Sequence, residues 1–321
     1  MYAYIIRRLL LIIPTLILVT MIVFLSIRLI PGNVIELMVA ERPAEGGMQA
    51  QKLDTEFLRH KLGFDVPVYV QYGRWVGGIL RGDFGESLWS ERPVLQYVIE
   101  RAPVSIQLGG MALIIAILFA LPIGIISAIR QETAGDYVGR TVAILAISLP
   151  NFWVATLVIV YPSILLNWSP ALTYIRPFED PAGNFIQFIL PATIQGMLMS
   201  GTTMRMTRTM MLEVLRQDYI RTAWSKGLNE RTVILRHALK NALIPVVSII
   251  GILIPIVIAG NVIIETIFTL PGIGQLLVQA INTRDYTILS GVNVILAVFV
   301  LLVNIGVDIS YAFLDPRIRY T

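Results

Sequence analysis

Long apolar runs constrain the fold of this 321-residue chain more than any other feature of its sequence. A helix needs about 20 mostly apolar residues to cross the hydrocarbon core of a bilayer. Six segments reach this length: 9–30, 104–129, 141–166, 188–207, 242–265 and 288–313. Hydrophobic residues make up 56% of the chain and charged residues 14%, which is more apolar surface than a soluble core of this length would bury. The sequence therefore predicts an all-α integral membrane protein with six transmembrane helices.

The fourth segment, 188–207, is the weakest of the six. Polar and small residues interrupt its apolar run: Gln195, Gly196, Ser200, Gly201 and several threonines. Two interpretations stay open. The helix lines a polar path, or it packs inside the bundle through its small residues.

The distribution of basic residues predicts the orientation, because lysine and arginine mark the cytoplasmic side of a membrane protein. If the N-terminus is cytoplasmic, the short inner segments carry Arg7, Arg8, Arg130, Arg140, Arg205, Arg208, Arg216, Arg221, Lys226, Arg231, Arg236, Lys240, Arg317 and Arg319. The short loops on the opposite side carry only Arg176 and Arg284. We therefore expect a multi-pass protein of the cell (inner) membrane with both termini cytoplasmic. This bias also explains the net charge of +4 without a nucleic-acid partner.

The segment 31–103 has no apolar run long enough to cross the bilayer and is predicted to be an extracytoplasmic insertion. Five residues in it recur at helical spacing and predict an amphipathic helix on the bundle or the membrane: Val68, Tyr72, Trp75, Val76 and Ile79. A small cap and a docking surface for a receptor are both open as roles. The predicted organisation is an N-terminus with the first helix (1–30), this insertion, a five-helix core (104–313) and a cytoplasmic tail (314–321).

The inner stretch 208–241 has the pattern of an amphipathic helix, a tight turn and a second amphipathic helix. The first helix is predicted to bury Leu212, Leu215, Tyr219 and Ala223, and the second Leu235, Ala238, Leu239 and Ala242. Between them, Gly227 is suited to the left-handed conformation that ends a helix, and Asn229 to capping the next one. Such a rigid hairpin suits a groove on another protein. The alternative is a loop that only orients the neighbouring spans.

Residue types that support catalysis are scarce in this chain. It has no cysteine, and its two histidines, His60 and His237, lie far apart without a metal-ligand spacing. It also lacks the G-x-x-x-x-G-K-[ST] loop that holds nucleotide phosphates. We therefore predict a protein that is not an enzyme and binds no metal or cofactor of its own.

Polar residues inside a membrane span are costly and therefore informative. Asn261 and Glu265 lie four residues apart near the outer end of 242–265. They are candidates for an outer gate or for the substrate path. The alternative is a pair of helix-end residues that the outer medium hydrates.

The stretch MRMTRTMMLEVLRQDYIRTAWSKGLNERTVILRHALKNALIPV resembles the cytoplasmic coupling loop of permease subunits in ABC importers of the dipeptide/oligopeptide/nickel family. Further segments resemble the first of that family's two permease subunits, so that the resemblance covers nearly the whole chain: IIRRLLLIIPTL, RLIPG, VPVYVQYGRWVGGILRGDFGES, ETIFTLPGIGQLLVQAINTRDY and DPRIR.

The resemblance implies a type I ABC importer permease (MetI-like) fold, in which a short coupling helix docks into a cleft of a cytoplasmic ATPase. The residues it assigns to ATPase coupling are Asp218, Tyr219, Arg221, Thr222, Ala223, Lys226, Gly227 and Leu228. Gly227 takes the place of the motif glycine. Arg221 stands where the broad superfamily pattern has glutamate, so no role built on an acidic residue carries over to that position.

The resemblance also implies the partners and the substrate class. The partners are a paralogous second permease, two ABC ATPases that bind ATP and Mg, and an extracytoplasmic solute-binding protein. Di- and oligopeptides are the expected substrates, while nickel complexes, glutathione and oligosaccharides remain alternatives. A secondary transporter is the rival class, but it would more often place ionisable residues centrally in several spans, whereas here the charges gather at the ends.

Overall fold

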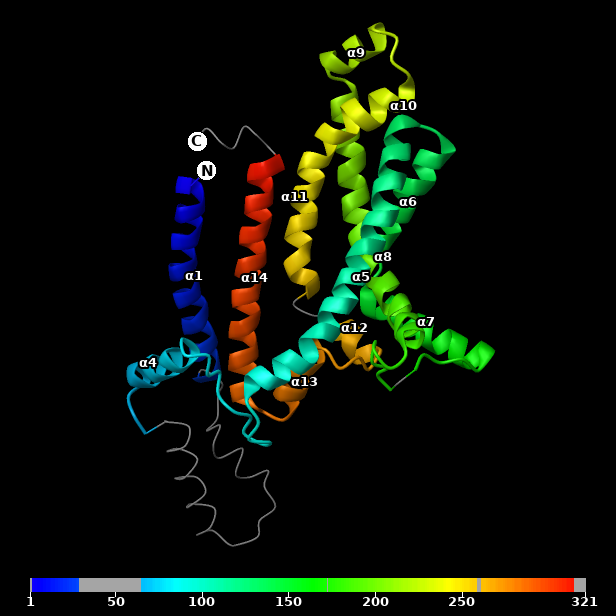
Figure 1. The fold of residues 1–321 in the computed structure, drawn as a ribbon. Coiled ribbons are helices and arrows are strands. Elements are labelled where there is room, and N and C mark those ends of the chain that lie inside the picture. The colour runs from blue at the N-terminus through cyan, green and yellow to red at the C-terminus, as the bar shows by residue number, and fades with distance from the viewer. Residues whose placement is uncertain (1, 29–64, 172, 259–260, 315–321) are drawn as a thin grey trace. The chain divides into compact units, whose positions relative to one another are not determined.

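The computed structural model describes residues 2–28, 65–171, 173–258 and 261–314 (Figure 1). These residues form helices joined by turns, and the pairing of Glu86 with Pro93 is the only β-bridge among them. The helices are α1 (Tyr2–Arg28), α4 (Val68–Ile79), α5 (Val94–Ile129), α6 (Ala134–Ser148), α7 (Asn151–Leu166), α8 (Pro181–Leu215), α9 (Asp218–Ser225), α10 (Glu230–Thr232), the π-helix η1 (Val233–Ala238), α11 (Leu239–Ile258), α12 (Val262–Ile267), α13 (Ile273–Asn282) and α14 (Tyr286–Leu314). The all-α prediction is confirmed.

Three of the described helices are long and apolar enough to cross a membrane: Val94–Ile129, Glu230–Pro255 and Tyr286–Val307. The pair α6 and α7 is a fourth candidate if its two bent parts form one span. A shorter apolar helix, Leu10–Ser26, lies within α1. By length and composition the described helices thus supply up to four of the six predicted spans.

The third predicted span, 141–166, is bent where the sequence suggested one straight helix. α6 and α7 meet at 95°. The break is at Leu149, which has an extended ψ of 126° and precedes Pro150. The proline ring disfavours the helical conformation of the residue before it, so α6 ends here and α7 starts in a new direction.

The fifth predicted span, 242–265, is also not one helix. α11 ends at Ile258, and α12 begins at Val262 with Asn261 as its N-cap. The side-chain oxygen of Asn261 accepts a hydrogen bond from the backbone N–H of Ile264 at 3.2 Å. Asparagine is a favoured N-cap residue, and its role here is to start a helix rather than to line a continuing one.

The chain divides into two compact units. Unit 1 comprises residues 1–5, 101–276 and 300–321, and unit 2 comprises residues 6–100 and 277–299. Within unit 1, α8 packs against α6 and α11. A Cβ atom on Gly196 would lie 2.6 Å from the carbonyl oxygen of Ala112 on α5, and one on Gly201 would lie 2.7 Å from that of Ala143 on α6. These glycines therefore serve close helix packing.

In unit 2, the predicted amphipathic helix of the insertion is confirmed as α4, and it packs on α1. The hydroxyl groups of Thr20 and Tyr72 lie 2.9 Å apart. The ring of Phe24 on α1 lies 5.2 Å from the ring of Tyr72 and 5.5 Å from that of Trp75. The aromatic face of α4 thus covers part of α1.

Candidate functional site

The helical hairpin of residues 218–238, which the sequence predicts on the cytoplasmic side and which we call the inner hairpin, follows directly on the end of α8 (Figure 1). The predicted first helix is broken into two, because α8 ends at Leu215 and Gln217, with an extended ψ of 148°, starts α9. The break moves Tyr219 out of the predicted apolar stripe, and its side chain is 42% exposed. Ile220, fully buried, takes the inner position instead. The hydroxyl group of Tyr219 accepts a hydrogen bond from the side chain of Asn241 at 2.7 Å.

The turn of the hairpin is built as the sequence predicts. Gly227 has φ +76°, a conformation that residues with a side chain rarely adopt. Its N–H donates to the carbonyl of Trp224 at 2.9 Å, and the N–H of Leu228 donates to that of Ala223 at 3.4 Å, the bond pair of a Schellman motif. The side chain of Asn229 then accepts from the N–H of Thr232 at 2.9 Å and caps α10. The helix, turn and helix are confirmed.

The buried face of the hairpin, which we call its inner face, is anchored in an apolar cluster. Its buried members come from α5, α8, α9, η1 and α11: Ala128, Met211, Ile220, Ala223, Val233, Ile234, Ala238 and Ala242. The second helix differs from the prediction at Leu235, which is 48% exposed. The reason is η1, whose wider π-helical turn changes which residues face inward. The anchor fixes α9 to the ends of three longer helices.

The opposite face of the hairpin, which we call its outer face, is exposed. Among the predicted coupling residues, Ala223 is buried, whereas the others are exposed: Asp218, Tyr219, Arg221, Thr222, Lys226, Gly227 and Leu228. Trp224 was not among the predicted residues, but its side chain is 45% exposed on α9. A tryptophan outside the apolar stripe of a charged helix is the signal that could have identified it, because aromatic residues are enriched in protein interfaces.

A buried ion pair joins α6 and α8 close to the hairpin. The guanidinium of Arg208 donates through Nε to Oδ1 of Asp136 at 2.8 Å and through Nη2 to Oδ2 at 2.9 Å. Asp136 also accepts from the hydroxyl of Ser127 and, at 3.1 Å, from the N–H of Glu132. The pair lies outside the predicted spans, and Arg208 holds the pKa of Asp136 well below its usual range. Sequence reasoning missed this pair because its partners lie 72 residues apart.

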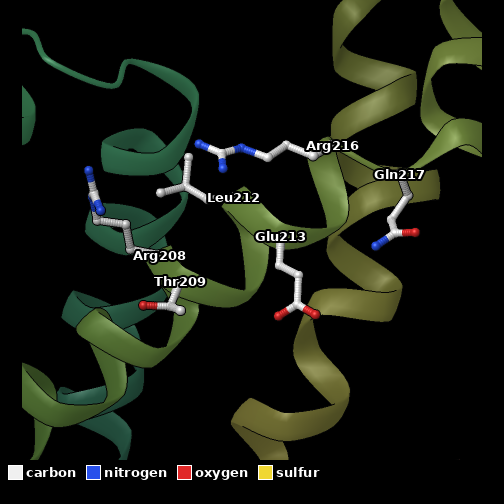
Figure 2. A pocket seen from close by; sticks show the side chains of 6 residues that line it. All are labelled: Arg208, Thr209, Leu212, Glu213, Arg216 and Gln217. Atoms are coloured by element: carbon white, nitrogen blue, oxygen red, sulfur yellow. The ribbon is translucent and has the colours of Figure 1, made fainter.

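An open pocket of ≈ 490 Å³ lies beside Arg208 at the end of α8, lined by Arg208, Thr209, Leu212, Glu213, Arg216 and Gln217. In Figure 2, Leu212 lies between the side chains of Arg208 and Arg216, and Glu213 and Gln217 extend toward the other side of the helix. Charges of both signs line the pocket, so its composition does not select an anion or a cation.

Glu265 is fully buried on α12 and holds the turn between α12 and α13. Its carboxylate accepts from the hydroxyl of Ser105 at 2.7 Å and from the N–H of Gln275 at 3.0 Å. The Ser105 hydroxyl oxygen accepts in turn from the N–H of Ile273 at 2.8 Å. A Cβ atom on Gly272 would lie 2.4 Å from the carboxylate, so any other residue there would displace the Glu265 side chain from its hydrogen bonds. The structure thus brings Glu265 and α5 together, while Asn261 caps the same short helix.

Comparison with known proteins shows the family of the chain. Residues 120–320 match the family described as binding-protein-dependent transport system inner membrane component, and residues 1–109 match the N-terminal family of such membrane components. The chain is 39% identical to the di/tripeptide transport system permease protein DppB of Pseudomonas aeruginosa, with 100% of this chain and 99% of that protein covered. It is 35% identical to the dipeptide transport system permease protein DppB of Escherichia coli K12, again over 100% and 99%.

The fold has a counterpart among solved structures, the crystal structure of an amino acid ABC transporter with histidines. The TM-score is 0.50 at 13% sequence identity, with 70% of this chain and 94% of that chain covered. This likeness bears on the fold alone. The chain therefore belongs to the family of binding-protein-dependent transport system inner membrane components, as a multi-pass ABC transporter permease of the inner membrane.

Proposed function

We propose that this chain forms half of the translocation pathway of an ATP-driven importer for di- and oligopeptides, which an extracytoplasmic solute-binding protein delivers. The full-length relatives that carry dipeptide and di/tripeptide permease names support the substrate class. The observation that carries the mechanism is the inner hairpin, whose inner face is buried in an apolar cluster while its outer face exposes Tyr219, Trp224 and Leu228.

The proposed complex contains a paralogous second permease and two cytoplasmic ABC ATPases, which hold ATP and Mg. Because this chain has no phosphate-binding loop, its energy must come from those subunits. The basic residues of the hairpin support a cytoplasmic position for it and for both termini.

The outer face of α9 is proposed to dock into the ATPase. An exposed apolar residue beside charged ones, as at Trp224 with Arg221 and Lys226, is a common interface composition. ATP binding would bring the ATPases together and displace α9. The apolar anchor would then pass that displacement to α5, α8 and α11, which rock the two permeases between inward- and outward-open states.

Asn261 and Glu265 are proposed to act at the outer gate as supports. Asn261 starts α12, and the buried carboxylate of Glu265 ties the following turn to Ser105 on α5. A gate element that moves with α5 needs such an internal tie, because backbone N–H groups of the turn would otherwise be buried without an acceptor.

The docking proposal is tested by Trp224→Ala, with Trp168→Ala as the matched control. The two tryptophans are 45% and 46% exposed, but Trp168 follows α7 in a loop predicted to lie outside. Loss of an interface anchor costs about 2 kcal/mol or more, roughly a 30-fold weaker association. Co-purification of the ATPase subunits should fall for Trp224→Ala alone. Equal behaviour of the two variants would contradict docking through α9.

The substrate class is tested separately, by uptake into proteoliposomes that contain the complete complex and its solute-binding protein. Labelled dipeptides and tripeptides should accumulate only with ATP present. Accumulation of nickel complexes, glutathione or an oligosaccharide in their place would reassign the substrate and leave the transport mechanism standing. Ion-driven uptake by this chain alone would refute the importer.

A further inference from the structure

We propose that Asp136 and Arg208 are positioning residues for energy coupling, which lock α5, α6 and α8 into one body that moves with the inner hairpin. This inference rests on the proposed function, because it assumes that α9 receives the movement of an ATPase. Neither residue is among the eight residues that the resemblance assigns to ATPase coupling.

The residues that form hydrogen bonds in this network belong to three different helices. Ser127 belongs to α5, Asp136 to the first turn of α6 and Arg208 to α8. Nε of Arg208 also donates to the hydroxyl oxygen of Ser127 at 3.1 Å. A guanidinium and a carboxylate that share two parallel hydrogen bonds fix their mutual orientation as well as their distance. The three helices are therefore fixed relative to one another at this point.

The helices pack closely around the pair. A Cβ atom on Gly124 of α5 would lie 2.8 Å from Cβ of Thr207, the residue before Arg208. One on Gly139 of α6 would lie 3.1 Å from the terminal methyl carbon of Met204. Since there is no space for even one added carbon atom at Gly124 without a shift, we infer that α5, α6 and α8 behave as one packed block around the ion pair.

The block continues directly into the hairpin anchor on two of its helices. On α5, Ser127 of the ion-pair network is followed by Ala128 of the apolar cluster. On α8, Met211 of the same cluster lies one turn after Arg208. The cluster also holds Ile220 and Ala223 of α9. A movement of α9 would therefore reach the ion-pair network through cluster residues that lie within one helical turn of it on α5 and α8.

Stability alone is a poor reason for such a pair. Asp136 is fully buried and Arg208 is 18% exposed, and burying two charges costs desolvation energy that their attraction often only offsets. Apolar residues of similar size frequently serve as well or better for stability. An apolar replacement would not fix the mutual orientation of α6 and α8, as two parallel hydrogen bonds do. A body that transmits movement needs that fixed orientation.

The test uses the complete complex in proteoliposomes, with Asp136→Asn as the main variant. Removing one partner of a buried ion pair is expected to lower the population in which α5, α6 and α8 are locked together by roughly 100-fold or more. We expect the complex to assemble and to hydrolyse ATP, while the number of peptides imported per ATP hydrolysed falls by about tenfold or more. Arg208→Lys keeps the charge without the two-pronged geometry and should give an intermediate ratio.

Glu179→Gln is the matched control. It removes the carboxylate of another arginine pair, Arg176 with Glu179, whose side chains are 73% and 67% exposed. Its import per ATP should stay at the wild-type value. An unchanged ratio in Asp136→Asn, or an equal loss in Glu179→Gln, would overturn the proposal.

A distance measurement keeps the proposal testable if Asp136→Asn fails to assemble. The chain has no cysteine, so spin labels attached through Val138→Cys on α6 and Arg231→Cys on α10 are specific within this subunit. Both positions are exposed. The distance between the labels should stay the same with and without ATP while the distance to the second permease changes. A change between α6 and α10 in the wild-type background would refute the single-body movement, whereas failure of all uptake with a constant distance would refute only the proposed function.

Discussion

Replacing Gly227 is the sharpest single perturbation of the inner hairpin, because backbone strain and steric clash predict opposite orders of the alanine and asparagine variants there. The residue has φ +76°, and a Cβ atom placed on it would meet nothing within 4 Å. Inside this chain a side chain therefore costs only backbone strain. We expect Gly227→Asn to be the mildest variant, Gly227→Ala to be worse and Gly227→Val to be the worst.

The size of the effect follows from the backbone angle. A left-handed conformation costs an ordinary residue about 1–2 kcal/mol, and more for a β-branched one. Asparagine adopts it more readily than alanine, since its short polar side chain bonds locally. Every 1.4 kcal/mol lowers the population of the native turn relative to a broken one by about tenfold. We therefore expect roughly tenfold weaker ATPase association for Gly227→Ala and a larger loss for Gly227→Val.

The assay is the amount of ATPase subunit retained on the immobilised permease pair over a range of ATPase concentrations, with uptake per unit of assembled complex as second readout. If the added side chain instead clashed with the ATPase, the smaller alanine would be tolerated better than asparagine. That reversed order, or a valine variant that binds like the wild type, would refute the view that the Schellman turn sets the position of α9.

Three further predictions concern the structural supports of the site. Glu265→Ala should lower the free energy of unfolding by roughly 2–4 kcal/mol, since the buried hydroxyl of Ser105 and the part-buried N–H of Gln275 lose their acceptor, and Glu265→Gln should cost less. Thermal denaturation checks this, with Thr266→Ala as an exposed control on the same helix. Gly201→Val should destabilise α8 by about 1–3 kcal/mol through its contact with a carbonyl of α6, whereas Gly110→Ala, with nothing within 4 Å, should be neutral or stabilising. The pKa of Asp136 is lower in the folded than in the unfolded chain, so the stabilisation by its ion pair is present above the unfolded pKa of about 4 and is lost as pH falls through the folded pKa. The decrease in melting temperature caused by Asp136→Asn should therefore be constant between about pH 5 and 8. A decrease that vanishes near pH 5 would contradict this.

Features written in a few consecutive residues could be predicted from the sequence. The turn at Gly227 needs only a residue without a side chain between two amphipathic segments, and the cap at Asn229 needs only an acceptor before a helix. The helix Val68–Ile79 was likewise visible from the spacing of its apolar residues. Each of these depends on local conformation, which one sequence specifies directly.

Features that depend on partners far along the chain could not be predicted in this way. No spacing rule connects Asp136 with Arg208, or Ser105 with Glu265, because their distance in sequence is set by the path of α5, α6 and α8. The end of α11 had a local signal at Asn261, but the apolar run on both sides outweighed it. Periodicity alone cannot distinguish a polar residue that continues a helix from one that caps the next.

Ala223 shows why a coupling motif cannot be read as a list of contact residues. The resemblance groups it with seven residues that the structure exposes, yet its side chain is buried in the cluster that holds α9. An alanine suits this position because a larger side chain would push α9 away from the cluster, while a polar one would be buried without a partner. Docking requires exposed side chains, and transmission requires a tight inner contact. A helix of two turns meets both demands only by dividing them between its faces, and under the proposed function this division, rather than any single residue, is what lets α9 transmit force.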